Sequence, residues 1–335
     1  ADGAYYFENS APLKPMPVDL LLRVTKQPKS TNRQPDSAAR ANKLSFCSIY
    51  ANTALQSECQ AILSAKDGAQ EFTLNAAALN SNLILLNSTS SRFPNGLGND
   101  SGLLGKYVAF HNYRSRVSGK YDGYLDKTTD GRSPTSGYIP RFRNLDGGSS
   151  AGYLRGFGYQ GGAGRGRQEG EGIGASFKES ITEAGNWSMG IGSWGEHLPY
   201  YENKVTLSKD KKDKWGLPLL DIDCEFKENE MKMRVDMKNS AAEMLEAAGI
   251  KNVSTYDTMP APGFCIHEMG TARMGKDPKT SVLNKWNQMH DAKNVFITDG
   301  SCMASSACQN PSLTYMALTA RATDFAVSEL KKGNL

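Results

Sequence analysis

The stretch "HEMGTARMG" (267–275), followed by "VFITDGSCMASSACQNPSLTYMALTARA" (295–322), decides how this chain is interpreted. The β-branched start of the second stretch, "VFIT" (295–298), predicts a short strand. Asn310 and Pro311 predict an amphipathic helix, with Asn310 as N-cap and Pro311 in the first turn. A strand, a loop of small residues and a helix N-terminus together present backbone N–H groups and a positive dipole end to a ligand. An ordinary capped helix is the alternative interpretation.

The four histidines of the chain can be weighed one by one. His267 follows a short apolar run and precedes a Gly-Thr step where the backbone can turn tightly. An imidazole titrates near neutral pH, which suits it to proton transfer. His111 lies in an alternating stretch typical of a strand, His197 in "WGEHLPYY", and His290 in a polar segment where we expect exposure. A structural histidine is the alternative interpretation of His267.

The composition narrows the class of protein. The chain has 335 residues, of which 39% are hydrophobic and 22% charged, as in a globular protein of one large or two modest domains. A formal charge of +4 is too small to indicate nucleic-acid binding. No apolar stretch reaches the roughly 18 residues of a membrane helix. Six cysteines without a CxxC pair argue against cysteine metal sites and a dense disulfide framework.

The middle of the chain predicts a mixed α/β structure. Residues 74–88 predict a helix with Leu79, Leu83 and Leu86 near one face, and residues 106–119 alternate as half-buried strands do. Further aromatic and glycine-rich segments predict more strands. Residues 225–250 predict a helix that ends at a left-handed Gly249. We therefore expect a central antiparallel sheet, bracketed by two segments of another layer.

The glycine-rich stretch "GGAGRGRQEGEGIGA" (161–175) invites a dinucleotide interpretation. Its spacing never gives GxGxxG, and neither a β-rich run nor a helix flanks it. We predict a mobile surface loop, whose Arg165 and Arg167 are placed to cover an active site. The basic run "SKDKKDKW" (208–215) predicts a solvated turn, since aspartates interrupt its lysines.

The order His, Gly-Thr, Arg-Met-Gly, then Asp-Gly-Ser and Asn-Pro-x-x-Thr, resembles the C-terminal signature of the glucose–methanol–choline (GMC) oxidoreductases, which are FAD-dependent alcohol oxidases and dehydrogenases. The segment 79–108 is similar to the one that leads from the flavin domain to the substrate domain. "GYIPRFRN" (137–144) and "RGFGYQGG" (155–162) resemble the bacterial branch that oxidises the C3 hydroxyl of glucosides, the glucoside 3-dehydrogenases. The resemblance covers about residues 75–335.

The resemblance implies an α/β (α+β) fold of the GMC type, with parts of a flavin-binding Rossmann-like domain and a substrate domain whose sheet is largely antiparallel. On this basis residues 1–74 are unassigned, 75–105 are a flavin-domain segment, and 106–255 form the substrate domain. Residues 256–335 are the C-terminal flavin-domain segment that carries the catalytic residues.

The resemblance also implies a cofactor, FAD, and the residues that serve it. His267 matches the catalytic histidine and Asn310 the second active-site position. Hydride would pass to flavin N5 while His267 takes the hydroxyl proton as general base, and Asn310 would orient that hydroxyl. No metal is expected. The predicted cofactor-binding residues are Asp299, Gly300, Asn310, Pro311 and Thr314.

Residues 1–70 show no counterpart of the strand, GxGxxG and helix that open family members. A second chain that supplies the ADP-binding half, an incomplete chain and a loss of flavin binding are the alternatives. The expected substrate is a sugar or glucoside, and the expected electron acceptor a cytochrome c or a quinone. A flavin-free carbohydrate-binding or partner subunit, and a flavoenzyme for a sterol or aryl alcohol, are the competing functions. We expect the periplasm rather than the cytoplasm.

Overall fold

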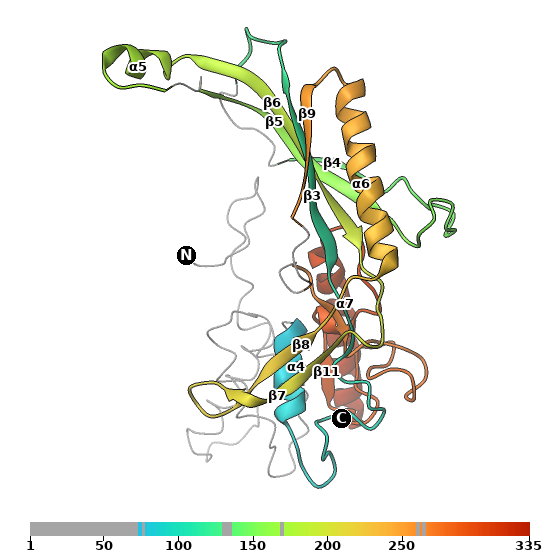
Figure 1. The fold of residues 1–335 in the computed structure, drawn as a ribbon. Coiled ribbons are helices and arrows are strands. Elements are labelled where there is room, and N and C mark those ends of the chain that lie inside the picture. Colours follow the sequence, from blue (N-terminus) through green and yellow to red (C-terminus); the bar gives the residue numbers. More distant parts are fainter. Residues whose placement is uncertain (1–72, 76–77, 129–135, 168–170, 259–261, 263–265) are drawn as a thin grey trace.

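The computed structural model of the chain describes residues 73–75, 78–128, 136–167, 171–258, 262 and 266–335 (Figure 1). The predictions for residues 1–72 lie outside this part, as do Cys47, Cys59 and Cys265. None of the helices among the described residues is long and apolar enough to cross a membrane. The mixed α/β fold with antiparallel sheets that the sequence predicts is confirmed.

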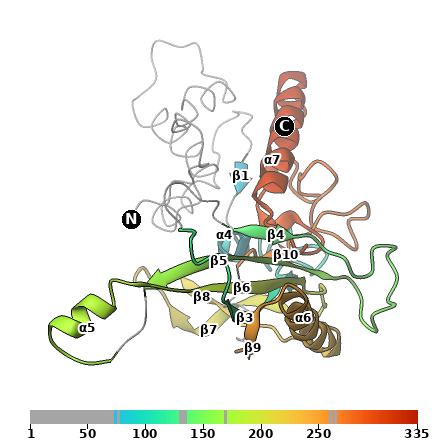
Figure 2. The ribbon, with the colours of Figure 1, turned by 90° about the horizontal axis from the view of Figure 1, so that it is seen from above.

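The largest sheet has five antiparallel strands in the order β4-β5-β6-β3-β9. The alternation expected in this region places Val117, Tyr159 and Ile191 on one face, where they pack against Met233 and Met237 of a long helix, α6. Figure 2 shows α6 on one side of this sheet and the C-terminal helix α7 on the other. The bounds are β3 His111–Tyr121, β4 Gly137–Ile139, β5 Phe157–Arg167, β6 Ala184–Glu196, β9 Lys251–Asp257, α6 Glu228–Ala247 and α7 Ser312–Lys332.

Local signals define both ends of α6. The backbone N–H of Lys227 donates to Glu230 Oε2 at 3.0 Å, so the side chain of the third helical residue caps the first turn. Gly249 follows the helix with φ +79°, the left-handed conformation that the sequence predicts there. The predicted helix over 225–250 is thus confirmed, and α6 is a few residues shorter at each end, with the bounds given above.

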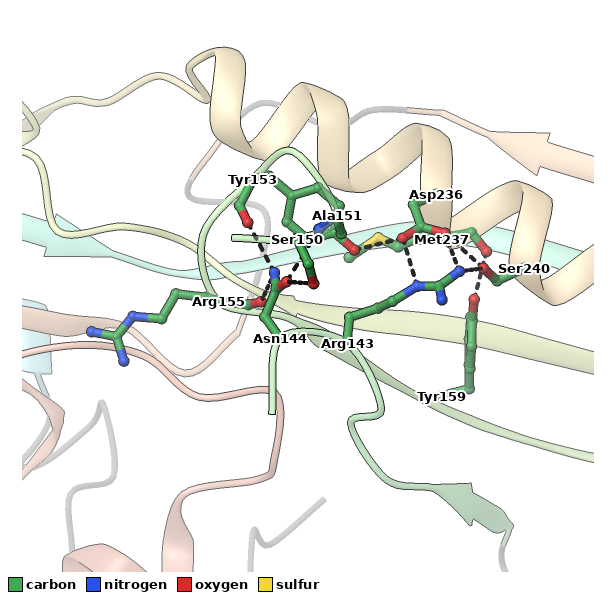
Figure 3. A network of polar contacts seen from close by, with 10 residues as sticks. All are labelled: Arg143, Asn144, Ser150, Ala151, Tyr153, Arg155, Tyr159, Asp236, Met237 and Ser240. Carbon is green, nitrogen blue, oxygen red and sulfur yellow. Dashed lines mark hydrogen bonds and ion pairs between the residues drawn. The ribbon is translucent and has the colours of Figure 1, made fainter. Parts of the chain in front are cut away.

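A hydrogen-bonded polar network fastens the loop between β4 and β5 to α6 (Figure 3). The Arg143 guanidinium binds both carboxylate oxygens of Asp236, at 2.9 and 3.0 Å, and Tyr153 Oη donates to the same carboxylate at 2.7 Å. Asn144 Nδ2 donates to the backbone oxygens of Tyr153 and Arg155. Because bidentate Arg–carboxylate pairs fix orientation as well as distance, this loop is held on the α6 side of the sheet.

A second sheet has four antiparallel strands in the order β10-β2-β7-β8. Strand β10 comes from the C-terminal part of the chain, so this sheet joins the segment around His267 to the middle of the sequence. A parallel pair, β1 and β11, forms a third, two-stranded sheet. The bounds are β1 Thr73–Asn75, β2 Lys106–Ala109, β7 Lys204–Lys212, β8 Pro218–Asp223, β10 Met269–Thr271 and β11 Val295–Ile297. The division into domains stays a prediction.

The helix predicted over 74–88 is present but shorter. Helix α4 spans Ala78–Asn87. Leu79, Leu83 and Leu86 are only half-buried, whereas Ser81 and Leu85 are fully buried. The predicted helix is confirmed, and its most deeply buried side carries Ser81 and Asn82, whose side chains hydrogen-bond Asp299 and Thr271.

The prediction of a mobile loop at 161–175 is wrong for its first half. Residues up to Arg167 belong to β5, which pairs with β6 as a projecting hairpin (Figure 1). A short helix, α5 (Ala175–Ser180), lies at its tip. Gly161 approaches the backbone of β6 so closely that a Cβ would collide with the Gly190 oxygen, so the glycines serve strand pairing.

The two arginines of this hairpin are engaged within it. Arg165 donates to the backbone oxygens of Gly185 at 2.6 Å and Leu125 at 2.7 Å, and Arg167 donates to that of Thr182. They fasten the hairpin to its neighbours and do not cover the segments around His267 and Asn310. The run at 208–215 forms the end of β7 and the exposed turn after it.

Candidate active site

Helix α4 and direct backbone bonds bring the two signature segments together. Asn82 Nδ2 donates to Thr271 Oγ1 at 2.6 Å, and Ser81 Oγ donates to Asp299 Oδ2 at 2.5 Å. The backbone N–H of Ala272 also donates to the oxygen of Ser301 at 3.0 Å. The two segments that the sequence singles out, 267–275 and 295–322, therefore lie against each other in one region, which we call the corner.

His267 stands just before β10, at a sharp turn of the backbone. Its φ is +65°, an uncommon left-handed conformation for a residue other than glycine. Gly270, with φ +84°, lies so close to the Tyr107 carbonyl that a Cβ would collide with it. The tight turn expected at the Gly-Thr step is thus where β10 pairs with β2, just after His267.

The His267 ring meets a second histidine. His267 Nδ1 lies 2.7 Å from Nε2 of His111, the first residue of β3, and the two rings are nearly perpendicular at 82°. His111 is 1% exposed, and Trp194 of β6 packs edge-on against its ring. With Nδ1 engaged, Nε2 is the nitrogen of His267 that remains for a substrate.

Burial keeps both histidines neutral. It lowers the pKa of His111 to about 4, with repulsion from His267 as a further cause, and it lowers the pKa of His267 below its ordinary value. Nearby Glu196 is ion-paired with Arg141 at 2.8 Å, while burial raises the pKa of Glu268. At neutral pH an uncharged imidazole is therefore ready to accept a proton.

Asn310 lies directly before the start of α7 and is exposed. Its Oδ1 accepts a hydrogen bond from Gln160 Nε2 of β5 at 2.9 Å. The predicted N-cap is wrong by one residue: Pro311 is the N-cap of α7, and the helix begins at Ser312. The Asn310 side chain does not cap α7, because its oxygen accepts the hydrogen bond from Gln160 of the sheet. No side chain caps α7.

The remaining predicted cofactor residues surround this helix start. The Asp299 carboxylate is buried and accepts hydrogen bonds from Ser81 and Ser301, and burial raises its pKa. Gly300 packs on the carbonyl of Glu268, too closely for a Cβ. Thr314 is exposed in the first turn of α7, and Pro311 is buried. Their predicted contacts with FAD stay predictions.

Two residues of the corner are not predicted as site residues. His111 and Gln160 are separated from their partners by 156 and 150 positions of sequence, and only the five-stranded sheet brings them there. The alternation around His111 indicates a strand but not which face meets His267. Gln160 lies at the edge of the glycine-rich stretch, where a loop is expected.

The corner fits one end of a flavin. Helix α7 opens without a side-chain cap, so its first N–H groups and positive dipole end are available to an electron-rich ring edge. Leu313 and Met316 on its first turns are 78% and 58% exposed, so their apolar side chains are accessible to a flat ring. The described residues that would hold the ring are thus Asn310, Thr314 and their helix turn.

Comparison with known families decides the assignment. Residues 199–319 match the family described as GMC oxidoreductase, and the match includes the first signature segment and the second as far as residue 319. The chain belongs to this family. The resemblance inferred from "HEMGTARMG" and the Asp-Gly-Ser to Asn-Pro stretch is thereby confirmed.

Curated relatives of this GMC chain include dehydrogenases and oxidases. It is 33% identical to 2-methyl-1,2-propanediol dehydrogenase of Mycolicibacterium austroafricanum, over 77% of this chain and 48% of the relative. It is 28% identical to fructose dehydrogenase large subunit of Gluconobacter japonicus, over 79% and 48%. Paromamine 6'-oxidase of Streptomyces fradiae is also 28% identical, over 78% and 46%. The chain spans about half the length of these relatives.

Solved structures agree on the fold. A formate oxidase structure superposes with a TM-score of 0.50 at 14% identity, covering 79% of this chain and 55% of the other. A variant used to study FAD modification in the formate oxidase of Aspergillus oryzae RIB40 gives 0.51 at 15% identity, with the same coverage. At such identities the likeness concerns the fold, and it confirms the expected GMC-type architecture.

Proposed function

We propose that this GMC chain carries the substrate-facing part of an FAD-dependent oxidoreductase that oxidises a hydroxyl group of a sugar or glucoside. The observation that supports the proposal is that hydrogen bonds join the segment of His267 to the segment that leads into α7, whose uncapped start follows Asn310. Relatives named for fructose and paromamine support a polyhydroxylated substrate, and the secondary hydroxyl at C3 is the finer proposal.

The proposed chemistry divides between the protein and its cofactor. An alcohol becomes a carbonyl when its carbon gives up a hydride and its oxygen a proton. FAD, when bound, supplies the hydride acceptor at N5. His267 Nε2 takes the proton, since burial keeps the ring neutral. Because Gln160 binds Asn310 Oδ1, Asn310 Nδ2 is left to donate to the substrate oxygen and to orient it.

The same proposal extends to partners. A second polypeptide segment that carries the ADP-binding half would complete the FAD site. A cytochrome c or a quinone would then reoxidise the flavin. A relative named as a large subunit supports an assembly of several chains. The periplasm remains the compartment we propose.

The visible absorption spectrum of the purified chain, before and after anaerobic addition of methyl glucoside, tests this proposal. We expect a flavin spectrum that bleaches with methyl glucoside and stays unchanged with its 3-deoxy analogue. Bleaching with both sugars would refute oxidation at C3 while leaving the flavoenzyme intact. A protein that stays colourless when FAD is added would mean that the chain needs the segment with the ADP-binding half, or that it is the flavin-free carbohydrate-binding or partner subunit.

A further inference from the structure

The contact between His111 and His267 requires one shared proton. Their nitrogens, Nε2 and Nδ1, are 2.7 Å apart, which is hydrogen-bond distance for two neutral imidazoles only if one ring donates and the other accepts. If His111 donates, His267 must carry its own proton on Nε2 and has no free lone pair. If His267 donates, its Nε2 is unprotonated. The tautomer of His111 therefore decides whether His267 can act as a base.

The surroundings of His111 favour the second arrangement. Its Nδ1 is buried and makes no hydrogen bond of regular geometry in the described part of the chain. The backbone carbonyls of Gly195 and Ala307 lie near the ring and favour a proton on it. Since Nε2 already faces His267, the nitrogen left for those carbonyls is Nδ1. A lone pair at Nδ1 would be repelled by these carbonyl oxygens, whereas an N–H at Nδ1 would be attracted to them.

The frame around His111 holds it in this orientation. The neighbouring Asn112 points to the opposite face of the sheet, where its Nδ2 donates to the Glu230 backbone oxygen at 2.9 Å and its Oδ1 accepts from Arg234 at 2.8 Å. The ring of Trp194 lies edge-on against His111, with centroids 5.3 Å apart. A ring buried among such fixed groups has little freedom to turn and exchange its nitrogens.

We propose that His111 is a positioning residue for His267: it accepts the Nδ1–H of His267 and so keeps Nε2 of His267 unprotonated and directed to the substrate. The inference rests on the proposed role of His267 as the base. It adds that the base nitrogen is selected by a residue of the substrate sheet. Charged groups close to the pair are Glu196 of β6, paired with Arg141, and Glu268, which follows His267.

The tautomer can be measured without turnover. With four histidines in the chain, two-bond proton–nitrogen correlation spectra of uniformly labelled, full-length protein resolve every imidazole, and single His→Gln variants assign them. We expect His267 to be protonated at Nδ1 in the wild type at neutral pH. His111→Leu removes the acceptor at little cost in volume, and His267 should then adopt the Nε2–H form that free imidazoles prefer. His111→Gln keeps an acceptor oxygen and should preserve Nδ1–H.

Turnover gives the second readout. Because an orienting partner of a reactive imidazole is typically worth about 10- to 100-fold, His111→Leu should lower kcat by that factor with KM nearly unchanged. His111→Gln should recover most of the loss. The inference would be overturned if wild-type His267 carried its proton on Nε2, or if His111→Leu left the tautomer of His267 unchanged. If the tautomer changes as expected while kcat does not, the hydrogen bond stands and the role of His267 as base fails.

Discussion

On the face of the five-stranded sheet that α6 covers, Val117, Ile191 and Met237 interlock in an apolar core. On the opposite face, His111 of β3 contacts His267 in the first signature segment, and Gln160 of β5 contacts Asn310 in the second. Glycines flank Gln160 along β5. One sheet thus supports the fold with one side and the proposed chemistry with the other. Substitutions on the two faces should have separable effects, on stability or on turnover.

The largest effect expected on the chemical face is that of His267→Ala. Loss of a general base typically costs about 10²- to 10⁴-fold in rate, so kcat should fall by that factor, while the melting temperature changes little because the residue is only half-buried. His290→Ala is the matched control, since His290 bonds Ser281 elsewhere in the chain and should retain turnover. Activity within tenfold of wild type in His267→Ala would remove this residue from the mechanism.

Met237→Ala tests the other face. Its side chain projects from α6 and is fully buried against the sheet, and truncating a buried methionine costs about 2–5 kcal/mol in free energy of unfolding because a cavity remains. Urea unfolding measures the loss of stability. The kcat per folded, flavin-loaded molecule should match that of the wild type. Met231→Ala on the exposed side of α6 is the control and should be nearly neutral. A fall in kcat in Met237→Ala at conditions where it is folded would break the separation of the faces.

The two faces also differ in what the sequence could predict. Helix α6 follows from signals a few residues apart, the apolar spacing and Gly249, and the signature segments are short enough to be recognised by eye. His111 and Gln160 could not be assigned, because their partners lie more than a hundred residues away and strand register decides which side chains meet. The buried side of α4 could not be predicted in full for a related reason, since the buried polar side chain of Ser81 bonds Asp299, 218 positions away.

A pH titration of stability isolates His111. Its folded pKa is lowered to about 4, whereas unfolded histidine titrates near about 6.5. Between these values the unfolded chain binds the extra proton, so the folded state loses stability as the pH falls. The free energy of unfolding of wild type relative to His111→Gln should therefore drop by about 3 kcal/mol between pH 7 and pH 4.

The comparison with His111→Gln removes the contribution of other buried groups. Glu268 and Asp299, whose pKa values burial raises, titrate in both proteins and cancel in the difference. Urea unfolding at several pH values gives the two curves. A difference that stays constant from pH 7 to pH 4 would mean that His111 is not held neutral by its surroundings.

The smallest effect expected concerns Gln160, whose amide binds Asn310. Gln160→Leu keeps the volume and removes the donor. A single hydrogen bond contributes about 0.5–1.5 kcal/mol, so kcat should fall about three- to tenfold as Asn310 loses its orientation, with stability unchanged. Lys120→Ala, an exposed substitution on the same face of β3, is the control and should leave kcat as it is.

A double-mutant cycle separates this role from direct substrate contact. If Gln160 acts through Asn310, then Gln160→Leu should lower kcat in the wild type but have no further effect in an Asn310→Ala background, since the side chain it positions is gone. Equal losses in both backgrounds would show that Gln160 touches the substrate itself. In that case the chemical face of the sheet would contribute a binding residue at this position, and Asn310 would owe its orientation to the turn before α7 alone.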